Sequence, residues 1–297
     1  MTGDAATDKT PLRFPDFLGI GAQKAGTTWL HKKLEQHPDI WMPPLKEIHY
    51  FDVLHLDYVK DPATGLTGMD VGRIDKALVS TEWALKSSRT AAGKIRIIHL
   101  LALIGLRELT DEWYGTIFRH AGTGTVCGEI TPEYALLPPA GIEHIVRLRP
   151  DVKIIFIIRD PIDRGWSDLR MMQRRTNSSG AHELHQIGSR QFLQRADFMA
   201  TIERFRQFIP AENMLILFFD DVVERPAKLV LDVCNFLAVD PARAKFKGLD
   251  KPVHEGQPGE LPRELYDEMR ARLRPAYERL LTLNSPIVKQ WYARHYG

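Results

Sequence analysis

Residues 17–30 read FLGIGAQKAGTTWL. A short apolar run, typical of a buried strand, leads into a glycine-bounded turn that contains Lys24, and a helical pattern follows. Such a turn directs backbone N–H groups at an anion, and the positive end of the following helix adds to the attraction. Lys24 adds a full charge, and Thr27 and Thr28 add hydroxyl donors. The stretch therefore predicts a phosphate-binding loop. The alternative is an ordinary strand-to-helix turn that needs glycine for its dihedral angles.

The loop does not follow the Walker A pattern, G-x-x-x-x-G-K-[ST]. Gly21 and Gly26 have the required separation, but Thr27 follows Gly26 and the lysine lies inside the loop, at Lys24. We therefore expect a different anionic group, held at a different place.

Composition places the chain among ordinary globular proteins. It has 297 residues, a net charge of +2 and a hydrophobic share of 44%. That length suits one large α/β domain or two small ones with a sizeable core. So mild a charge argues against nucleic acid as the main partner. Cys127 and Cys234 lie far apart, and we expect reduced core residues rather than a disulfide or a zinc site.

Two segments bear on targeting and membranes. Residues 1–14 have no apolar core, and we expect a flexible lead-in there rather than a signal peptide. The longest apolar stretch, residues 95–106, is interrupted by Arg96 and His99 and is too short to span a bilayer. We therefore expect a cytoplasmic protein without a membrane span. The sequence leaves the oligomeric state open.

Strand and helix patterns alternate along the chain. The run KIIFII at residues 153–158 is continuous and mostly β-branched, which is typical of a strand buried on both faces of a parallel sheet. This alternation predicts an α/β fold, a P-loop-like three-layer sandwich with a central parallel sheet, in which residues 1–297 form a single domain. Such sheets bind ligands at the carboxyl ends of their strands. The expected strands are 17–21, 125–129, 153–158 and 214–219, and the expected helices are 27–36, 141–148, 161–175, 191–208, 226–237 and 262–283.

A second group of polar residues follows the strand at 153–158. Residues 159–168 read RDPIDRGWSD, so that Arg159 lies at the strand end and Ser167 lies on the next helix, outside its apolar stripe. An arginine fork and a hydroxyl that converge there would suit a terminal phosphate dianion. In the alternative interpretation, Asp160 merely caps the helix, Arg164 lies on the surface and the serine is merely exposed.

The two segments together resemble a known family. QKAGTTWL, residues 23–30, and IIRDPIDRGWSD, residues 157–168, are similar to the two nucleotide-binding signatures of sulfotransferases that use 3′-phosphoadenosine 5′-phosphosulfate (PAPS). The resemblance implies that the first loop holds the 5′-phosphosulfate end, that Trp29 lies near the adenine, and that Arg159 and Ser167 bind the 3′-phosphate. The product would be adenosine 3′,5′-bisphosphate. The residues implied for the 5′ end are Gln23, Lys24, Ala25, Gly26, Thr27 and Thr28.

Two further stretches are similar to the heparan or carbohydrate branch of that family. HPDIWMPPLKEIHYFD, residues 37–52, resembles its E-x-H-[FY]-F-D stretch, and GEITPEYALLP, residues 128–138, resembles its G-E-K-[ST]-P-x-Y stretch. Ile130 stands where the branch has a lysine. The membrane anchor and carboxyl-terminal disulfide of Golgi members have no counterpart in this sequence, so we expect a bacterial, cytoplasmic member. The segment 251–259 aligns only loosely with the family's carboxyl-terminal nucleotide loop.

The resemblance implies catalytic roles for three residues. Glu47 would be the general base, His49 would assist with the proton or orient the acceptor, and Lys24 would neutralise charge on the departing phosphate oxygen. Sulfuryl transfer needs positioning and charge stabilisation more than covalent chemistry, and its electrostatics require no metal. A surface pair beside two prolines is the alternative for Glu47 and His49. Asp52 is a further candidate near the acceptor.

The role of the third stretch remains open at this point. Glu129 and Thr131 either line the cleft, or Glu129 holds the loop through backbone hydrogen bonds. The acceptor would be a hydroxyl or amine of a sugar, glycolipid or small molecule. An anionic acceptor could meet three arginines on the helix after Ser167, although such a basic helix face is usually solvated. These arginines are Arg170, Arg174 and Arg175.

Residues 55–110 exceed what the resemblance accounts for. The stretch 95–109 is apolar around most of a helix, so we expect other parts of the protein to cover it. A helical insertion that packs on its own core and borders the acceptor cleft is the simplest interpretation. A lid or wall of the acceptor pocket and an oligomer contact are the alternatives.

Two other functions compete with sulfuryl transfer. A P-loop kinase of a small metabolite or nucleotide is disfavoured because the loop lacks the G-K-[ST] register and no magnesium aspartate follows an apolar strand. A degenerate nucleotide-binding protein would bind the nucleotide without transfer, and the presence of Lys24 and Glu47 argues against it.

Overall fold

The computed structural model describes residues 11–57, 90, 94–95, 97–98, 100, 102–103, 108–176, 181–251 and 259–297, with the backbone alone at residues 175, 176 and 181. Most of the expected lead-in at 1–14, most of the expected insertion at 55–110 and the interior of the 251–259 segment lie outside these residues, as does the side chain of Arg175.

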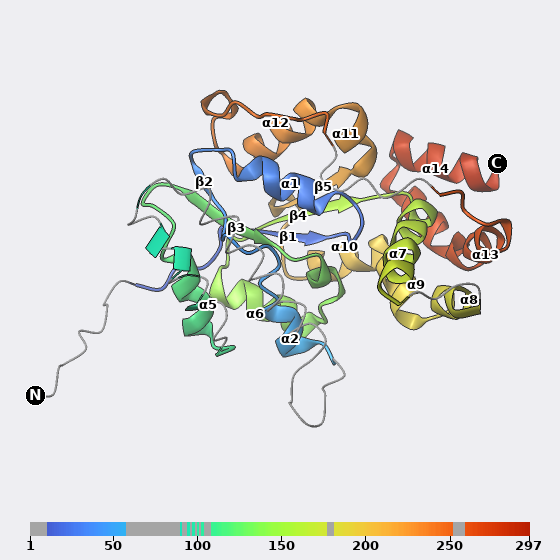
Figure 1. Ribbon diagram of the computed structural model, residues 1–297, viewed down its shortest axis with the longest axis horizontal. Coiled ribbons are helices and arrows are strands. Elements are labelled where there is room, and N and C mark those ends of the chain that lie inside the picture. The colour runs from blue at the N-terminus through green and yellow to red at the C-terminus, as the bar shows by residue number, and fades with distance from the viewer. Residues whose placement is uncertain are drawn as a thin grey trace, which may run out of the picture.

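Five parallel strands form the centre of the fold (Figure 1). They lie in the order β2-β3-β1-β4-β5, with β1 paired to β3 on one side and to β4 on the other. The sheet confirms the predicted α/β class and all four expected strands. The strand β2 was missed because two residues are too few to show a periodic pattern. The strands are β1 Phe17–Gly21, β2 Ile40–Trp41, β3 Val126–Ile130, β4 Lys153–Ile158 and β5 Met214–Phe218.

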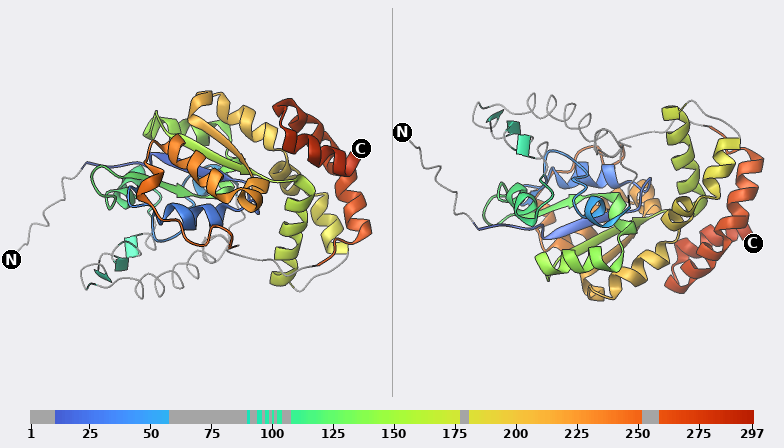
Figure 2. Two further views of the ribbon diagram at one scale, coloured as in Figure 1. Left: turned by 90° about the horizontal axis from the view of Figure 1, so that it is seen from above. Right: turned by 90° about the horizontal axis from the view of Figure 1, so that it is seen from below.

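Helices cover both faces of the sheet. The helices α1, α11 and α12 lie on one face and α2, α5 and α6 on the other, as both views of Figure 2 show. The helices α7, α8, α9, α13 and α14 gather at one end (Figure 1). The described helices are α1 Thr27–Leu34, α2 Phe51–His55, α5 Asp111–Phe118, α6 Pro139–Leu148, α7 Pro161–Thr176, α8 Ala181–Ile187, α9 Arg190–Ala196, α10 Phe198–Arg206, α11 Phe219–Glu224, α12 Pro226–Leu237, α13 Arg263–Leu280 and α14 Pro286–Tyr296, with 3₁₀ turns η1 Pro132–Leu136, η2 Ala211–Asn213, η3 Pro241–Arg243 and η4 Leu281–Leu283.

The prediction of a single helix over residues 191–208 is wrong. The chain forms α9 and α10 instead, and the break lies at Asp197, which has φ −85° and ψ 74°. The Asp197 side chain accepts a hydrogen bond from the Ala200 amide and so caps α10. An aspartate within a helical pattern can therefore end one helix and begin the next, which apolar periodicity alone does not reveal.

The core follows the predicted strands. Residues 154–158 of β4 are at most 1% exposed, as expected for a strand covered on both faces. Cys127 and Cys234 are buried free thiols, as expected. Of the apolar stretch at 95–109, Leu100 is buried but Ile95 and Ile98 are 68% and 51% exposed. Within the single chain, these two side chains are therefore not covered. Among the helices that the structure describes, none is both long and apolar enough to cross a bilayer.

The sheet brings the predicted motifs to one edge. The loop at 22–26 follows β1, the loop at 42–50 follows β2, Thr131 follows β3 and Arg159 follows β4. Because parallel strands end at the same edge, segments far apart in sequence meet there.

Candidate active site

The first predicted loop has the shape of an anion-binding turn. Lys24 and Gly26 both adopt left-handed conformations, with φ of 69° and 85°. A Cβ atom on Gly26 would lie 3.1 Å from the Phe219 ring, so this position requires glycine for both its dihedral angle and its space. Gly26 precedes α1 and supplies no side-chain cap, which leaves the first amides of the helix available to a ligand.

Other members of the first loop reach a ligand in different ways. Ala25 is fully buried and can contribute only its backbone. Thr27 is 6% exposed, and Thr28 is half-buried. The Gln23 Oε1 atom is buried and has no hydrogen-bond partner among the described residues. A buried amide oxygen without a partner is costly unless a ligand or water satisfies it.

Arg159 joins the second motif to the first. Its Nη1 donates a hydrogen bond of 3.0 Å to the carbonyl oxygen of Lys24, and its guanidinium lies 4.4 Å from the centre of the Phe219 ring. The strands β1 and β4 that carry these residues are neighbours in the sheet. Phe219 was missed by the sequence analysis. Its place directly after β5, at the carboxyl edge of the sheet, is the signal that could have found it.

Positive charge is concentrated around Lys24. Burial lowers the pKa of Lys24, the nearby Asp168 opposes this shift, and Arg174, Arg159 and Arg170 add to it. Burial likewise lowers the pKa of Arg159. Cations held this close together repel one another, so they favour an anion that carries several charges.

The helix α7 presents the second motif. Ser167 is half-buried, and Arg170 and Arg174 follow it at the three- and seven-residue spacing that places side chains on one helix face. Asp160 accepts hydrogen bonds from the Ile162 and Asp163 amides and so caps α7. The capping role of Asp160 is thus confirmed, and it holds beside the contact between Arg159 and Lys24. The surface position expected for Arg164 in the same alternative is wrong, because Arg164 is fully buried and pairs with Asp168 at 3.3 Å.

Two carboxyl-terminal helices, α13 and α14, hold Asp160 in place. Asp160 is 2% exposed, and it also contacts the Tyr277 hydroxyl of α13 and, at 3.0 Å, Nε2 of His295 on α14. These two partners lie more than a hundred positions from Asp160, so no sequence pattern indicated them. They hold the start of α7 next to Arg159.

Two tryptophans attach the late segment of the chain to the two motifs. Trp29 is 4% exposed and donates its indole N–H to the Leu249 carbonyl over 3.2 Å, while Trp166 donates to the Gly259 carbonyl over 3.2 Å. Residues 252–258, between these anchors, lie outside the described part of the chain. The loosely aligned segment therefore begins and ends beside the predicted nucleotide site.

The loop after β2 holds the predicted catalytic pair. Glu47 and His49 both adopt left-handed conformations, with φ of 67° and 56°. His49 lies between two carboxylates: its Nδ1 is 2.7 Å from Oδ2 of Asp52, and its Nε2 is 3.7 Å from Oε2 of Glu47. Glu47 also pairs with Lys46.

The charge state of His49 follows from these contacts. Burial disfavours its protonated form, but hydrogen bonds and Coulomb attraction to Asp52 and Glu47 outweigh it and raise the pKa of His49 to about 9. His49 is therefore a cation at neutral pH: its Nδ1–H donates a hydrogen bond to Asp52, and its Nε2 lies at ion-pair distance from Glu47. The His49 side chain is only 6% exposed, which argues against a solvated surface pair, and Asp52 is fully buried against His49 rather than open to an acceptor.

Glu129 and Thr131 do not line a cleft. Both are fully buried. Glu129 accepts a hydrogen bond from the Ile48 amide, between Glu47 and His49, so the loop-holding alternative is the one the structure supports.

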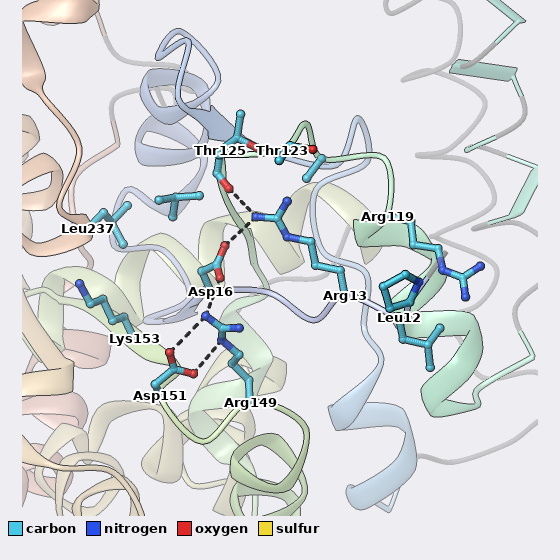
Figure 3. Close-up of a pocket in the computed structure, with 14 residues that line it drawn as sticks. Leu12, Arg13, Asp16, Arg119, Thr123, Thr125, Arg149, Asp151, Lys153 and Leu237 are labelled. Atoms are coloured by element: carbon cyan, nitrogen blue, oxygen red, sulfur yellow. Dashed lines mark hydrogen bonds and ion pairs between the residues drawn. The ribbon is translucent and has the colours of Figure 1, made fainter. Parts of the chain in front are cut away.

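A cavity of about 700 Å³ lies at the opposite edge of the sheet (Figure 3). Asp16 and Lys153, at the amino ends of β1 and β4, line it. Its charged groups largely pair with one another: Arg13 contacts Asp16 at 3.1 Å, and Arg149 contacts Asp16 and Asp151 at 2.8 Å. The candidate site is therefore separate from this cavity. No cluster of metal-ligating side chains occurs within the described residues.

Comparisons with known proteins bear on this arrangement. A sequence model described as "Sulfotransferase family" matches residues 15–242. No curated protein matches the chain. A sulfotransferase from Alicyclobacillus acidocaldarius has a TM-score of 0.61 at 21% identity, over 91% of this chain and 95% of its own.

Two other solved structures are similar. The sulfotransferase domain of the Synechococcus PCC 7002 olefin synthase has a TM-score of 0.54 at 17% identity, over 93% of this chain and 97% of its own. A sulfotransferase from Mycobacterium avium has a TM-score of 0.52 at 14% identity, over 92% and 77%. At such low identities these likenesses establish the fold.

Proposed function

The chain belongs to the sulfotransferase family, and we propose that it transfers the sulfuryl group of PAPS to a hydroxyl or amine of a sugar, glycolipid or small-molecule acceptor. The observation that carries the proposal is the hydrogen bond from Arg159 to the Lys24 carbonyl. It unites the two nucleotide-binding motifs in one positively charged site. The G-E-x-T-P-x-Y and E-x-H-Y-F-D stretches favour the carbohydrate branch.

The residues present suit PAPS. The uncapped start of α1 and Lys24 would hold the 5′-phosphosulfate, whose oxygens only accept hydrogen bonds, so Gln23 would donate its side-chain N–H there. Arg159 and Ser167 would bind the 3′-phosphate, and the buried Trp29 would pack near the adenine. PAPS supplies the activated sulfuryl group. The remaining contacts would come from Ala25, Gly26, Thr27 and Thr28.

Three side chains would carry the chemistry. Glu47 takes the proton of the acceptor as the acceptor atom forms its bond to sulfur, and the bond from sulfur to the phosphate oxygen breaks in line. Lys24 stabilises the negative charge that develops on that phosphate oxygen. The cationic His49 orients the Glu47 carboxylate, which its Nε2 faces. No step requires a metal.

We further propose that the chain forms a single domain and works in the cytoplasm. The two free buried thiols fit a reducing compartment, although a buried cysteine is also stable elsewhere. The acceptor would bind beside the loop at 42–50.

Nucleotide binding tests the proposal against its alternatives. We expect adenosine 3′,5′-bisphosphate to bind without magnesium in calorimetry, whereas a P-loop kinase would bind ATP in a magnesium-dependent manner. Incubation with sulfur-labelled PAPS and pools of glycans and small metabolites should then yield a labelled product. Tight bisphosphate binding without label transfer to any pool would instead indicate a nucleotide-binding protein without activity.

A further inference from the structure

The loop with Glu47 and His49 is held in an unusual conformation. Both residues have positive φ, which costs an L-residue energy and persists only where surrounding contacts enforce it. Ile48 lies between them and is fully buried. The groups that hold its backbone therefore decide where the two catalytic side chains point.

One buried carboxylate supplies the central contact. Glu129, at the end of β3, is fully buried, and its Oε2 accepts the Ile48 amide at 3.2 Å and the Thr131 hydroxyl at 2.8 Å. Its Oε1 accepts the hydroxyls of Tyr114 and Tyr134 at 2.7 and 2.8 Å. All four contacts deliver a hydrogen to the carboxylate. The neutral amide of glutamine has only one oxygen, so it could not replace both acceptors.

A second contact extends the same network. The Tyr134 hydroxyl accepts the Tyr50 amide at 3.1 Å, and the Tyr50 ring stacks on Tyr114 with a centroid distance of 4.4 Å. The amides on both sides of His49, those of Ile48 and Tyr50, are thus both held from the sheet side.

We propose that Glu129 is a positioning residue: its carboxylate anchors the Ile48 amide and so holds Glu47 and His49 in their left-handed conformations for catalysis. The inference rests on the proposed function for its effect on turnover. Glu129 cannot touch a substrate because it is fully buried, and it acts only through the loop.

Substitution Glu129→Gln tests the anchor without an acceptor. In the wild type we expect the Ile48 and Tyr50 amides to be protected from hydrogen exchange, and we expect His49 to titrate near pH 9 by NMR. In the variant we expect protection of Ile48 to fall at least tenfold and the pKa of His49 to move toward its ordinary value of 6.5. Val233→Ala, a core truncation on α12 across the sheet, should leave both readouts unchanged.

Unchanged Ile48 protection together with an unchanged His49 titration in Glu129→Gln would overturn the proposal. If that variant does not fold, Tyr134→Phe removes the acceptor of the Tyr50 amide and one donor to Glu129. It should loosen the same loop and produce the same two changes to a smaller extent. Identical behaviour of folded Tyr134→Phe and wild type would count against the anchor.

Turnover with sulfur-labelled PAPS separates positioning from general damage. We expect Glu129→Gln to lower kcat roughly tenfold or more with little change in the affinity for the bisphosphate. When Glu47→Gln is already present, adding Glu129→Gln should lower kcat much less. Losses that multiply in the double variant would show that Glu129 acts independently of Glu47. If the wild type transfers no label, the proposed function fails, while exchange and titration still decide whether Glu129 holds the loop.

Discussion

Arg159 donates a hydrogen bond of 3.0 Å to the backbone carbonyl of Lys24, a residue 135 positions earlier in the chain. The contact joins the ends of two adjacent parallel strands. Arg159 and the Lys24 loop are expected to bind opposite ends of one nucleotide. A substitution in either should therefore lower the affinity for the complete nucleotide.

Substitution Arg159→Ala should weaken binding of adenosine 3′,5′-bisphosphate by roughly 10- to 100-fold. A hydrogen bond between charged groups contributes about 1.5–3 kcal/mol, and the 3′-phosphate would lose such contacts. Calorimetry measures the change. Adenosine 5′-monophosphate, which lacks the 3′-phosphate, is the matched ligand, and its affinity should fall much less. Equal losses of affinity for both nucleotides would show that Arg159 does not contact the 3′-phosphate.

Substitution Gly26→Ala should disrupt the first loop. The residue has φ 85°, and the added Cβ would lie 3.1 Å from the Phe219 ring. Gly124→Ala is the matched control, because Gly124 has φ 79° but no atom of the described residues lies within 4 Å of the new Cβ. Both changes should cost about 1–2 kcal/mol of stability through backbone strain. Only Gly26→Ala should also weaken bisphosphate binding; comparable weakening in the control would exclude a local effect.

Substitution Glu47→Gln should lower kcat by about 10²–10⁴-fold, the usual contribution of a general base. The amide keeps the size of the side chain but cannot accept the acceptor's proton. Affinity for adenosine 3′,5′-bisphosphate should be unchanged, since the implied contacts of the nucleotide lie on other loops. Label transfer from PAPS at wild-type rate would remove Glu47 from the mechanism.

The contacts of His49 predict a pH dependence of stability. Its pKa is raised from 6.5 to about 9 by Asp52 and Glu47, despite burial, so the folded state binds more protons than the unfolded state between these values. The stabilisation is fully present below about pH 6.5 and is lost as the pH rises through 9. The slope contributed by this one group is at most about 1.4 kcal/mol per pH unit.

Urea unfolding at several pH values measures this effect. The difference between the wild type and His49→Gln isolates the histidine from other groups that titrate in the same range. That difference should shrink as the pH rises from 6.5 to 9. A difference that stays constant over this range would contradict a protonated His49 in the folded protein.

Local patterns were sufficient for much of the fold and part of the site. The apolar run at 153–158 and the glycine-bounded turn at 21–26 each express a short-range rule, such as burial on both faces of a strand or a helix start that binds an anion. Arg159 and Lys24 could be expected to meet, since parallel strands end at one edge of the sheet. The mistaken helix at 191–208 shows the limit of periodicity where a capping residue, Asp197, interrupts it.

The sequence by itself determined four of the five strands, the glycine-bounded turn after the first of them and the edge of the sheet at which the predicted motifs meet, because these depend on neighbours within a few residues. Only the tertiary structure decided how the loop at 42–50 is held. Glu129 and the Ile48 amide are 81 positions apart, and the left-handed conformations of Glu47 and His49 depend on contacts of that kind. Hydrogen bonds between such distant groups leave no repeating pattern in a single sequence, so they appear only when the chain is folded.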